Sequence, residues 1–257
     1  MSEKTYNEDT FCYGESYAMV LDGASGLDKA DRMHTGSDAR WFVVKMQEEI
    51  QKHIQDDVSL STIVANAIQS LLPFYPLVEK SFMPSGCLSL VRIRNQKVEY
   101  IGFGDTVAII QTKQKTECLY DHAIERLDHM AIDTMQKSHL PFLEARKTVT
   151  PILVENRKMR NVPGGYCALD LSLDSLAFCI EKSWDLEDVQ SIALMSDGFY
   201  QLKEFLHQND DDFLQTLLTQ KEKTLPLLYS LQEKDWPCLE LPRLKKRDDT
   251  TILFFSL

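Results

Sequence analysis

The fold is decided by the stretch Met19-Val20-Leu21-Asp22-Gly23-Ala24-Ser25-Gly26, in which an apolar run ends in an aspartate and a small-residue loop. The run Ile192-Ala193-Leu194-Met195 is likewise followed, one residue on, by Asp197, and Asp248 stands before the run Ile252-Leu253-Phe254-Phe255. Apolar runs of this length predict buried β-strands, so each motif places a carboxylate at a strand end. Asp-Gly after a strand is also a common turn, so the three motifs indicate a site only together.

Three aspartates at strand ends predict a cation site if their strands meet. Converging carboxylates repel one another unless a cation lies among them. The six histidines form no ligand-spaced pair and the six cysteines form no C-x-x-C pair, so zinc is not indicated. Oxygen ligands without histidine or thiolate select Mg²⁺, Mn²⁺ or Ca²⁺.

Strand-rich and helix-rich blocks alternate around these motifs. Asp9–Tyr13 and Tyr17–Leu21 predict a β-hairpin, and Ser37 and Ser59 are expected N-caps of two amphipathic helices, the second ended by Pro73. Further strands are expected at Cys87–Ile93, Val98–Phe103, Thr106–Gln111, Tyr166–Leu169, Ser175–Ile180, Ile192–Ser196 and Thr250–Phe255, and further helices at Ala123–Arg160 and Gly198–Leu231. Because most neighbouring strands are tightly joined, the pattern predicts an α+β fold, antiparallel sheet with helices on its faces.

The composition excludes several classes of protein. The chain has 257 residues and a net charge of −11, which would repel a nucleic-acid backbone or an anionic lipid surface. No stretch approaches the ~20 apolar residues of a membrane span, and the N-terminus lacks the order of a secretory signal. The cysteines lie mostly inside apolar runs, as reduced core thiols do, so we expect a cytoplasmic protein without nucleic-acid or membrane partners.

Two charged runs lie outside the strand-end motifs. Asn209-Asp210-Asp211-Asp212 predicts a helix N-terminus, where carboxylates suit the helix dipole. The basic run Arg243-Leu244-Lys245-Lys246-Arg247 is typical of a solvated stretch, and it stands directly before Asp248.

Six short motifs follow one another along the chain. They are Asn7-Glu8-Asp9, Val20-Leu21-Asp22-Gly23-Ala24-Ser25-Gly26, Ser85-Gly86-Cys87-Leu88-Ser89-Leu90, Gly102-Phe103-Gly104-Asp105-Thr106, Ser196-Asp197-Gly198 and Arg247-Asp248-Asp249-Thr250-Thr251. In this order they resemble the signatures of the protein phosphatase 2C family, the metal-dependent (PPM) serine/threonine phosphatases. The resemblance, to bacterial-type members with one domain, covers essentially the whole chain, so we expect a single domain over residues 1–257. It implies a four-layer α-β-β-α sandwich, two antiparallel sheets flanked by helices.

The resemblance also implies a centre of two Mn²⁺ or Mg²⁺ ions at one end of the sandwich. Asp22 would bridge both ions and Gly23 would contribute its backbone carbonyl, whereas Asp197 and Asp248 would bind the first ion. Five further residues are carried over by position. Glu8 and Asp9 would bind the pair of ions directly or through their ligands, and Asp105 would bind a third, looser ion shared with Asp197. Asp249 would orient a bound water, and Lys4 would bind phosphate where many members have arginine.

The activity implied is hydrolysis of phosphoserine and phosphothreonine in proteins, by direct attack of a hydroxide that bridges the two metals. Asp22, Asp197 and Asp248 would be its catalytic residues. The expected partners are a phosphorylated protein substrate and a cognate serine/threonine kinase.

Three positions depart from the family pattern: Lys4 and Val107 stand where arginine is usual, and Ala24 where many members have a histidine. They favour an alternative, a catalytically weak or silent member that acts as a protein-binding regulatory module. A haloacid-dehalogenase-type phosphatase would need a second aspartate at position 24, which is alanine. The regulatory phosphatases that act on anti-anti-sigma factors share the family's fold and stay open.

Overall fold

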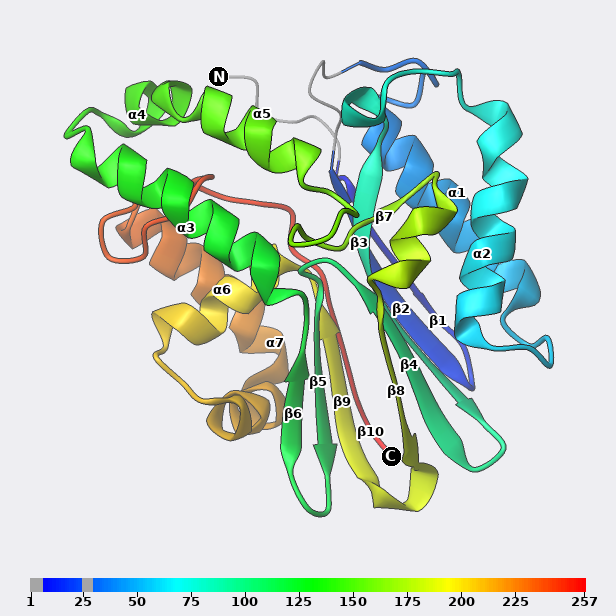
Figure 1. The fold of residues 1–257 in the computed structure, drawn as a ribbon. Helices are drawn as coiled ribbons and strands as arrows, with labels where there is room; N and C mark the ends of the chain where they lie inside the picture. The colour runs from blue at the N-terminus through cyan, green and yellow to red at the C-terminus, as the bar shows by residue number, and fades with distance from the viewer. Residues whose placement is uncertain (1–6, 25–29) are drawn as a thin grey trace.

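Two antiparallel β-sheets pack face to face in the computed structural model, which describes residues 7–24 and 30–257 (Figure 1). The first sheet has the order β1-β2-β3-β4-β8, with the short β7 beside β3, and the second has the order β10-β9-β5-β6. The strands of the first sheet are β1 (Asp9–Tyr13), β2 (Tyr17–Ala24), β3 (Ser85–Arg94), β4 (Lys97–Phe103), β7 (Leu169–Asp170) and β8 (Ile180–Asp185). Those of the second are β5 (Val107–Thr112), β6 (Thr116–Leu119), β9 (Val189–Met195) and β10 (Ile252–Ser256).

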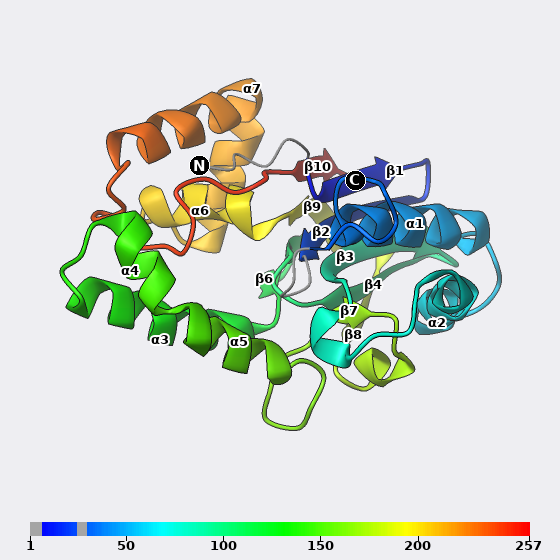
Figure 2. The ribbon, with the colours of Figure 1, turned by 90° about the horizontal axis from the view of Figure 1, so that it is seen from above.

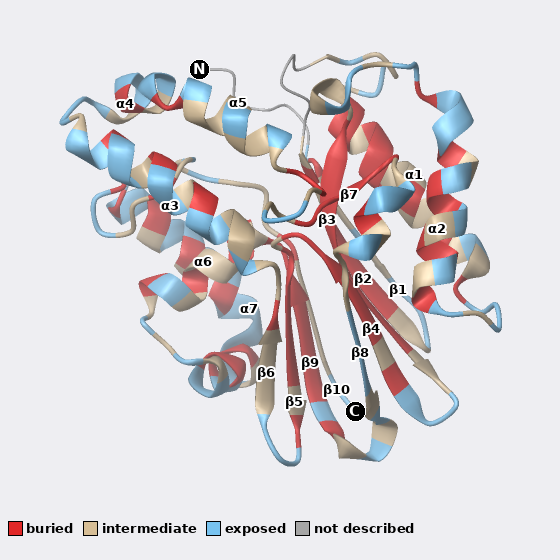
Figure 3. Cartoon of the chain, in the orientation of Figure 1, coloured by how far each residue is buried: buried red, intermediate tan, exposed pale blue. Residues whose placement is uncertain are grey.

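Helices cover the outer face of each sheet. Helices α1 (Asp38–His53) and α2 (Leu60–Leu71) pack on the first sheet, and α6 (Asp197–Phe205) and α7 (Asp210–Lys234) on the second. A third apolar cluster fills the space between the sheets. Figure 2 shows one helix pair on either side of the strands, and Figure 3 shows the central strands mostly buried and the outer helix faces exposed. The predicted four-layer α-β-β-α sandwich is therefore confirmed.

Helices α3 (His122–Lys137), α4 (Phe142–Thr148) and α5 (Thr150–Lys158) form a separate group at the upper left of Figure 1. They share a small apolar cluster of their own. Four 3₁₀ turns complete the described elements: η1 (Leu72–Phe74), η2 (Lys80–Phe82), η3 (Leu173–Ala177) and η4 (Leu186–Asp188). None of the helices that the structure describes has the length and apolar character needed to span a bilayer.

The predicted caps and most predicted strands are confirmed. Ser37 Oγ accepts a hydrogen bond from the backbone N of Arg40 at 3.1 Å, and Ser59 Oγ accepts one from Thr62 at 3.1 Å, so both serines cap their helices. Asn209 likewise caps α7, and the acidic run after it fills the first turn.

Two strand predictions in the middle of the chain are wrong. Ser175–Ile180 is largely a 3₁₀ turn capped by Ser172, and the strand begins only at Ile180. Of Tyr166–Leu169, only the last residue lies in a strand. The sequence pattern also missed β6. Both β6 and β8 are edge strands: β6 is short and mostly half-buried, and four of the six residues of β8 are exposed, so neither has the continuous apolar run of a buried strand.

Candidate metal centre

The register of the first sheet directs Asp22 and Asp9 into the space between the two sheets. Ala18 and Val20, at alternate positions of β2, pack between the sheets. Side chains alternate along a strand, so Asp22 continues the same series. Asp9 is the direct partner of Asp22 across β1 and β2 and lies on the same face.

The second sheet brings Asp105 and Asp197 to one end. Met195, the last residue of β9, pairs with Val107 at the start of β5 and with Ile252 at the start of β10. Asp105 lies two residues before Val107 and Asp197 two residues after Met195. Both aspartates therefore lie just past the last paired residues, at the same end of the strands.

Hydrogen bonds between segments far apart in the sequence hold Asp249 and its neighbours beside the start of β1. Asp249 Oδ2 accepts a hydrogen bond from the backbone N of Glu8 at 2.8 Å, and the Glu8 carbonyl accepts one from Gly23 N at 3.1 Å. Ser196 N donates to the Thr251 carbonyl at 3.1 Å, while Thr251 N donates to Ser196 Oγ at 3.0 Å. The segments of Glu8 and Asp249 thus meet where β2 and β9 end.

Gly198 permits a close approach at this point. A Cβ at position 198 would lie 2.1 Å from the Asp249 carbonyl oxygen and 3.1 Å from Asp248 Cβ. Only glycine therefore allows the segment of Asp248 to pass directly against the first turn of α6.

The pKa shifts show that the five aspartates form one interacting cluster. Burial raises the pKa of Asp22 well above its usual range, and the charges of Asp9, Asp197 and Asp248 raise it further. Burial and the charge of Asp248 also raise the pKa of Asp197, although a hydrogen bond with Asp22 lowers it in part. Burial raises the pKa of Asp9 and of Asp105 to about 7 each, and the charge of Asp197 contributes to both shifts.

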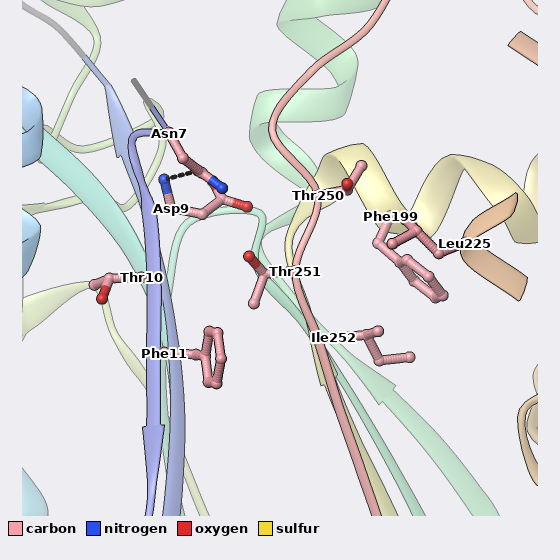
Figure 4. Close-up of a pocket in the computed structure, with 9 residues that line it drawn as sticks. All are labelled: Asn7, Asp9, Thr10, Phe11, Phe199, Leu225, Thr250, Thr251 and Ile252. Atoms are coloured by element: carbon pink, nitrogen blue, oxygen red, sulfur yellow. Dashed lines mark hydrogen bonds between the residues drawn. The ribbon is translucent and has the colours of Figure 1, made fainter. Parts of the chain in front are cut away.

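Several carboxylate oxygens in this cluster are buried without a hydrogen bond. They are both side-chain oxygens of Asp9 and Oδ1 of Asp197. The hydroxyls of Ser196 and Thr251 lie close enough to lower the pKa of Asp9 in part. Figure 4 shows the Asp9 side chain directed from β1 towards the segment of Thr250 and Thr251. These three residues line a pocket of about 340 Å³.

Oxygen atoms with unmet negative charge are the donors that hard divalent cations prefer, so the residues present fit Mg²⁺ or Mn²⁺. In the described part of the chain, however, no three acidic, histidine or cysteine side chains are close enough together to hold a metal ion as they stand. The ammonium of Lys245 lies among these carboxylates and forms an ion pair with Asp248 Oδ2.

Of the residues predicted from sequence, Asp9, Asp22, Asp105, Asp197 and Asp248 are brought together in this cluster. Their roles as ligands, and that of the Gly23 carbonyl, stay predictions.

The remaining predicted residues have different surroundings. Asp249 binds the backbone of Glu8, whose side chain is buried, and its predicted contact with a water stays a prediction. Lys4 lies outside the described residues.

Three charged residues near the cluster were missed by the sequence analysis. Burial raises the pKa of Asp128 on α3 to about 6, with a further contribution from Asp197 and opposing ones from Lys245 and Arg146. Arg146 on α4 donates from Nε to the Leu244 carbonyl at 3.1 Å. The position of Lys245, three residues before Asp248, could have pointed to the cluster. Asp128 and Arg146 lie on helices, and no local sequence pattern distinguishes them from surface residues.

No protein-family model matches the sequence, and no curated protein sequence matches it. Solved structures do match. The Mycobacterium tuberculosis serine/threonine phosphatase PstP/Ppp is 14% identical with a TM-score of 0.55, over 98% of this chain and 93% of that one. A structure of the PstP catalytic domain is 12% identical with a TM-score of 0.51, also over 98% and 93%. The PPM Ser-Thr phosphatase MsPP from Mycobacterium smegmatis is 12% identical with a TM-score of 0.52, over 98% and 93%.

The chain has the PPM phosphatase fold. At these identities the likeness establishes the fold, and the chemistry has to be argued from this chain's own residues. Within its PPM fold the carboxylate cluster lies where β2 and β9 end and just before β10 begins. Asp22 lies near the end of β2, Asp197 begins α6 after β9, and Asp248 lies in the segment before β10.

Proposed function

We propose that the chain is a metal-dependent phosphatase that hydrolyses phosphoserine and phosphothreonine in proteins. The observation that carries this proposal is the convergence of five aspartates from distant segments, some of whose oxygens are buried without a hydrogen bond. The structural neighbours support it, because they are serine/threonine phosphatases and the PstP catalytic domain is in complex with two manganese ions.

The residues would divide the work by position. Asp22, Asp197 and Asp248 would hold two divalent ions together with the carbonyl of Gly23, and Asp105 would face a third. Such ions supply an activated water nucleophile at neutral pH and stabilise charge on the phosphoryl oxygens. The carboxylates repel one another in the folded chain, so a divalent cation removes an unfavourable term when it binds.

The substrate would be a phosphorylated protein made by a serine/threonine kinase. A phosphopeptide panel assayed in Mn²⁺ and in Mg²⁺ tests this assignment and identifies the preferred ion. Hydrolysis confined to phosphotyrosine peptides would contradict it.

The first experiment compares Asp197→Asn with Asp57→Asn in the hydrolysis of p-nitrophenyl phosphate with added Mn²⁺. Loss of a metal ligand should reduce turnover by at least about 100-fold, since even outer partners of ligands cost 10- to 100-fold. Asp57 is 95% exposed and pairs with Arg94 at the surface, so its variant should keep full activity. Chelator should abolish the activity of the unmodified chain.

Folding must be intact for that comparison to count. The neutral amide of the Asp197→Asn variant takes a repelled charge out of the cluster. We therefore expect this variant, in chelator, to unfold at the same temperature as the unmodified chain or higher. A folded Asp197→Asn variant with unchanged turnover would refute the proposal.

A second candidate function is a catalytically weak or silent regulatory module. The observation that favours it is the ion pair of Lys245 with Asp248 inside the cluster, beside the departures at Ala24 and Val107. Calorimetric titration with Mn²⁺ separates the two functions, because a silent module should bind little metal.

A further inference from the structure

The basic run Arg243–Arg247 sends its charged side chains to different places. Arg243 is buried, and its Nη1 pairs with Asp235 Oδ2 at 2.7 Å. Lys246 and Arg247 stack on aromatic rings: Lys246 lies over Trp236 and Phe142, and Arg247 lies over Trp236 and Tyr229. Lys245 is the member of the run whose ammonium reaches the carboxylate cluster.

The backbone on either side of Lys245 is held in place. The Leu244 carbonyl accepts a hydrogen bond from Arg146 Nε at 3.1 Å, and the Lys246 carbonyl accepts one from Arg243 Nε at 3.2 Å. Asp235 in turn accepts hydrogen bonds from three backbone N–H groups of the same loop, at 2.7 to 3.1 Å. The loop therefore fixes the backbone position from which the Lys245 side chain extends.

The surroundings of the ammonium are anionic. Its Nζ donates to Asp248 Oδ2, and the charges of Asp197 and Asp22 also act on it. The side chain nevertheless keeps 51% of its surface exposed, so it has an open path back to solvent.

We propose that Lys245 is a built-in counter-ion of the metal centre, which neutralises part of the cluster and must withdraw before divalent cations fill it. This inference rests on the proposed function. An ammonium and a divalent ion at the same carboxylate repel each other, and either one supplies positive charge that neutralises the carboxylates. The two therefore compete for the same place. Lys245 therefore weakens metal binding and makes the centre responsive to the free metal concentration.

The test titrates Mn²⁺ into the chelator-treated full chain by calorimetry, with the variants Lys245→Met, Lys245→Arg and Lys246→Met. Lys245→Met should bind Mn²⁺ at least about tenfold more tightly than the unmodified chain, because it lacks the competing charge. Lys245→Arg keeps the charge and should bind as weakly as the unmodified chain or more weakly. Lys246→Met removes one positive charge next door, so it controls for net charge and should change the affinity by less than about threefold.

Thermal unfolding gives a second readout that does not depend on activity. A ligand stabilises the folded state more when it binds more tightly, so a given Mn²⁺ concentration should raise the unfolding temperature of Lys245→Met most. Unchanged or weaker Mn²⁺ affinity in Lys245→Met would overturn the inference and leave the proposed function standing, provided that the unmodified chain binds Mn²⁺.

Two other outcomes of the titration also test the inference. If the unmodified chain binds no Mn²⁺ but Lys245→Met does, the inference is supported, because the lysine then blocks the centre. If neither binds Mn²⁺, both the inference and the proposed metal centre fail.

Discussion

Replacing Gly198 with alanine sets two physical effects against each other. Position 198 lies in the first turn of α6, where alanine is favoured over glycine by up to ~1 kcal/mol. The new Cβ, however, would lie 2.1 Å from the Asp249 carbonyl oxygen, whereas real Cβ atoms essentially never come within 3.0 Å of another heavy atom. The Asp249 carbonyl must therefore move by about 0.9 Å away from α6, and the adjoining Asp248, whose Cβ would be 3.1 Å from the new methyl group, is displaced with it.

The expected losses of stability and of activity both follow from that displacement. Forcing an extra methyl into packed structure costs about 1–3 kcal/mol of unfolding free energy, so the helix gain is cancelled or exceeded. A shift of ~1 Å in a catalytic group costs on the order of 100-fold in rate, and the shift here falls on Asp248. We expect Gly198→Ala to be up to about 2 kcal/mol less stable and about 100-fold less active.

Denaturant unfolding measures the first quantity, and Mn²⁺-dependent hydrolysis of p-nitrophenyl phosphate measures the second. Gly164→Ala is the matched control. Gly164 has φ +78°, so alanine there costs about 1–2 kcal/mol, but its Cβ would meet nothing within 4 Å. The control should lose stability and keep its activity. If Gly198→Ala is instead stabilised by ~1 kcal/mol and fully active, Asp248 does not lie against α6 as described.

Two further predictions concern stability. Burial raises the pKa of Asp9 and Asp105 to about 7, so in chelator each contributes stability that is complete below the unfolded value of 3.8 and lost as the pH rises through about 7. The unfolding temperature of the metal-free chain should therefore fall between pH 5 and about 7 more than that of Asp105→Asn, and equal slopes would contradict this assignment. Asp235→Ala leaves the buried Arg243 without its partner and should cost about 3–5 kcal/mol in denaturant unfolding, whereas Lys97→Ala, in an exposed pair, should cost less than ~1 kcal/mol. Similar losses in both variants would show that the Asp235 pair does not anchor the loop.

The sequence predicted the fold best where burial leaves a clear pattern. The apolar run before Asp22 became β2, with Met19 and Leu21 against the outer helices and Val20 between the sheets. The edge strand β8 escaped prediction because most of its residues are exposed and its composition is mixed, as in Glu181-Lys182-Ser183. Neighbouring elements, and not local propensity, decide that these residues form a strand.

The residues of the candidate metal centre were likewise predictable only where they adjoin a buried apolar run. Asp22, Asp197 and Asp248 were predicted because each adjoins a buried run, and the structure brings them together. Lys245 and Asp128 could not be assigned, because a lysine in a basic run and an aspartate on a helix are ordinary surface residues in sequence. Tertiary packing decides their place: the hydrogen bond from Arg146 on α4 to the Leu244 carbonyl holds the loop that carries Lys245, and α3 brings Asp128 near Asp197.

Anomalous scattering from crystals grown with Mn²⁺ tests the metal centre most directly. The account predicts manganese peaks at the end of the sandwich, ~2 Å from carboxylate oxygens of Asp22, Asp197 and Asp248, with the Lys245 ammonium moved away. Crystals that show no manganese at this cluster, or manganese bound only elsewhere on the chain, would contradict it.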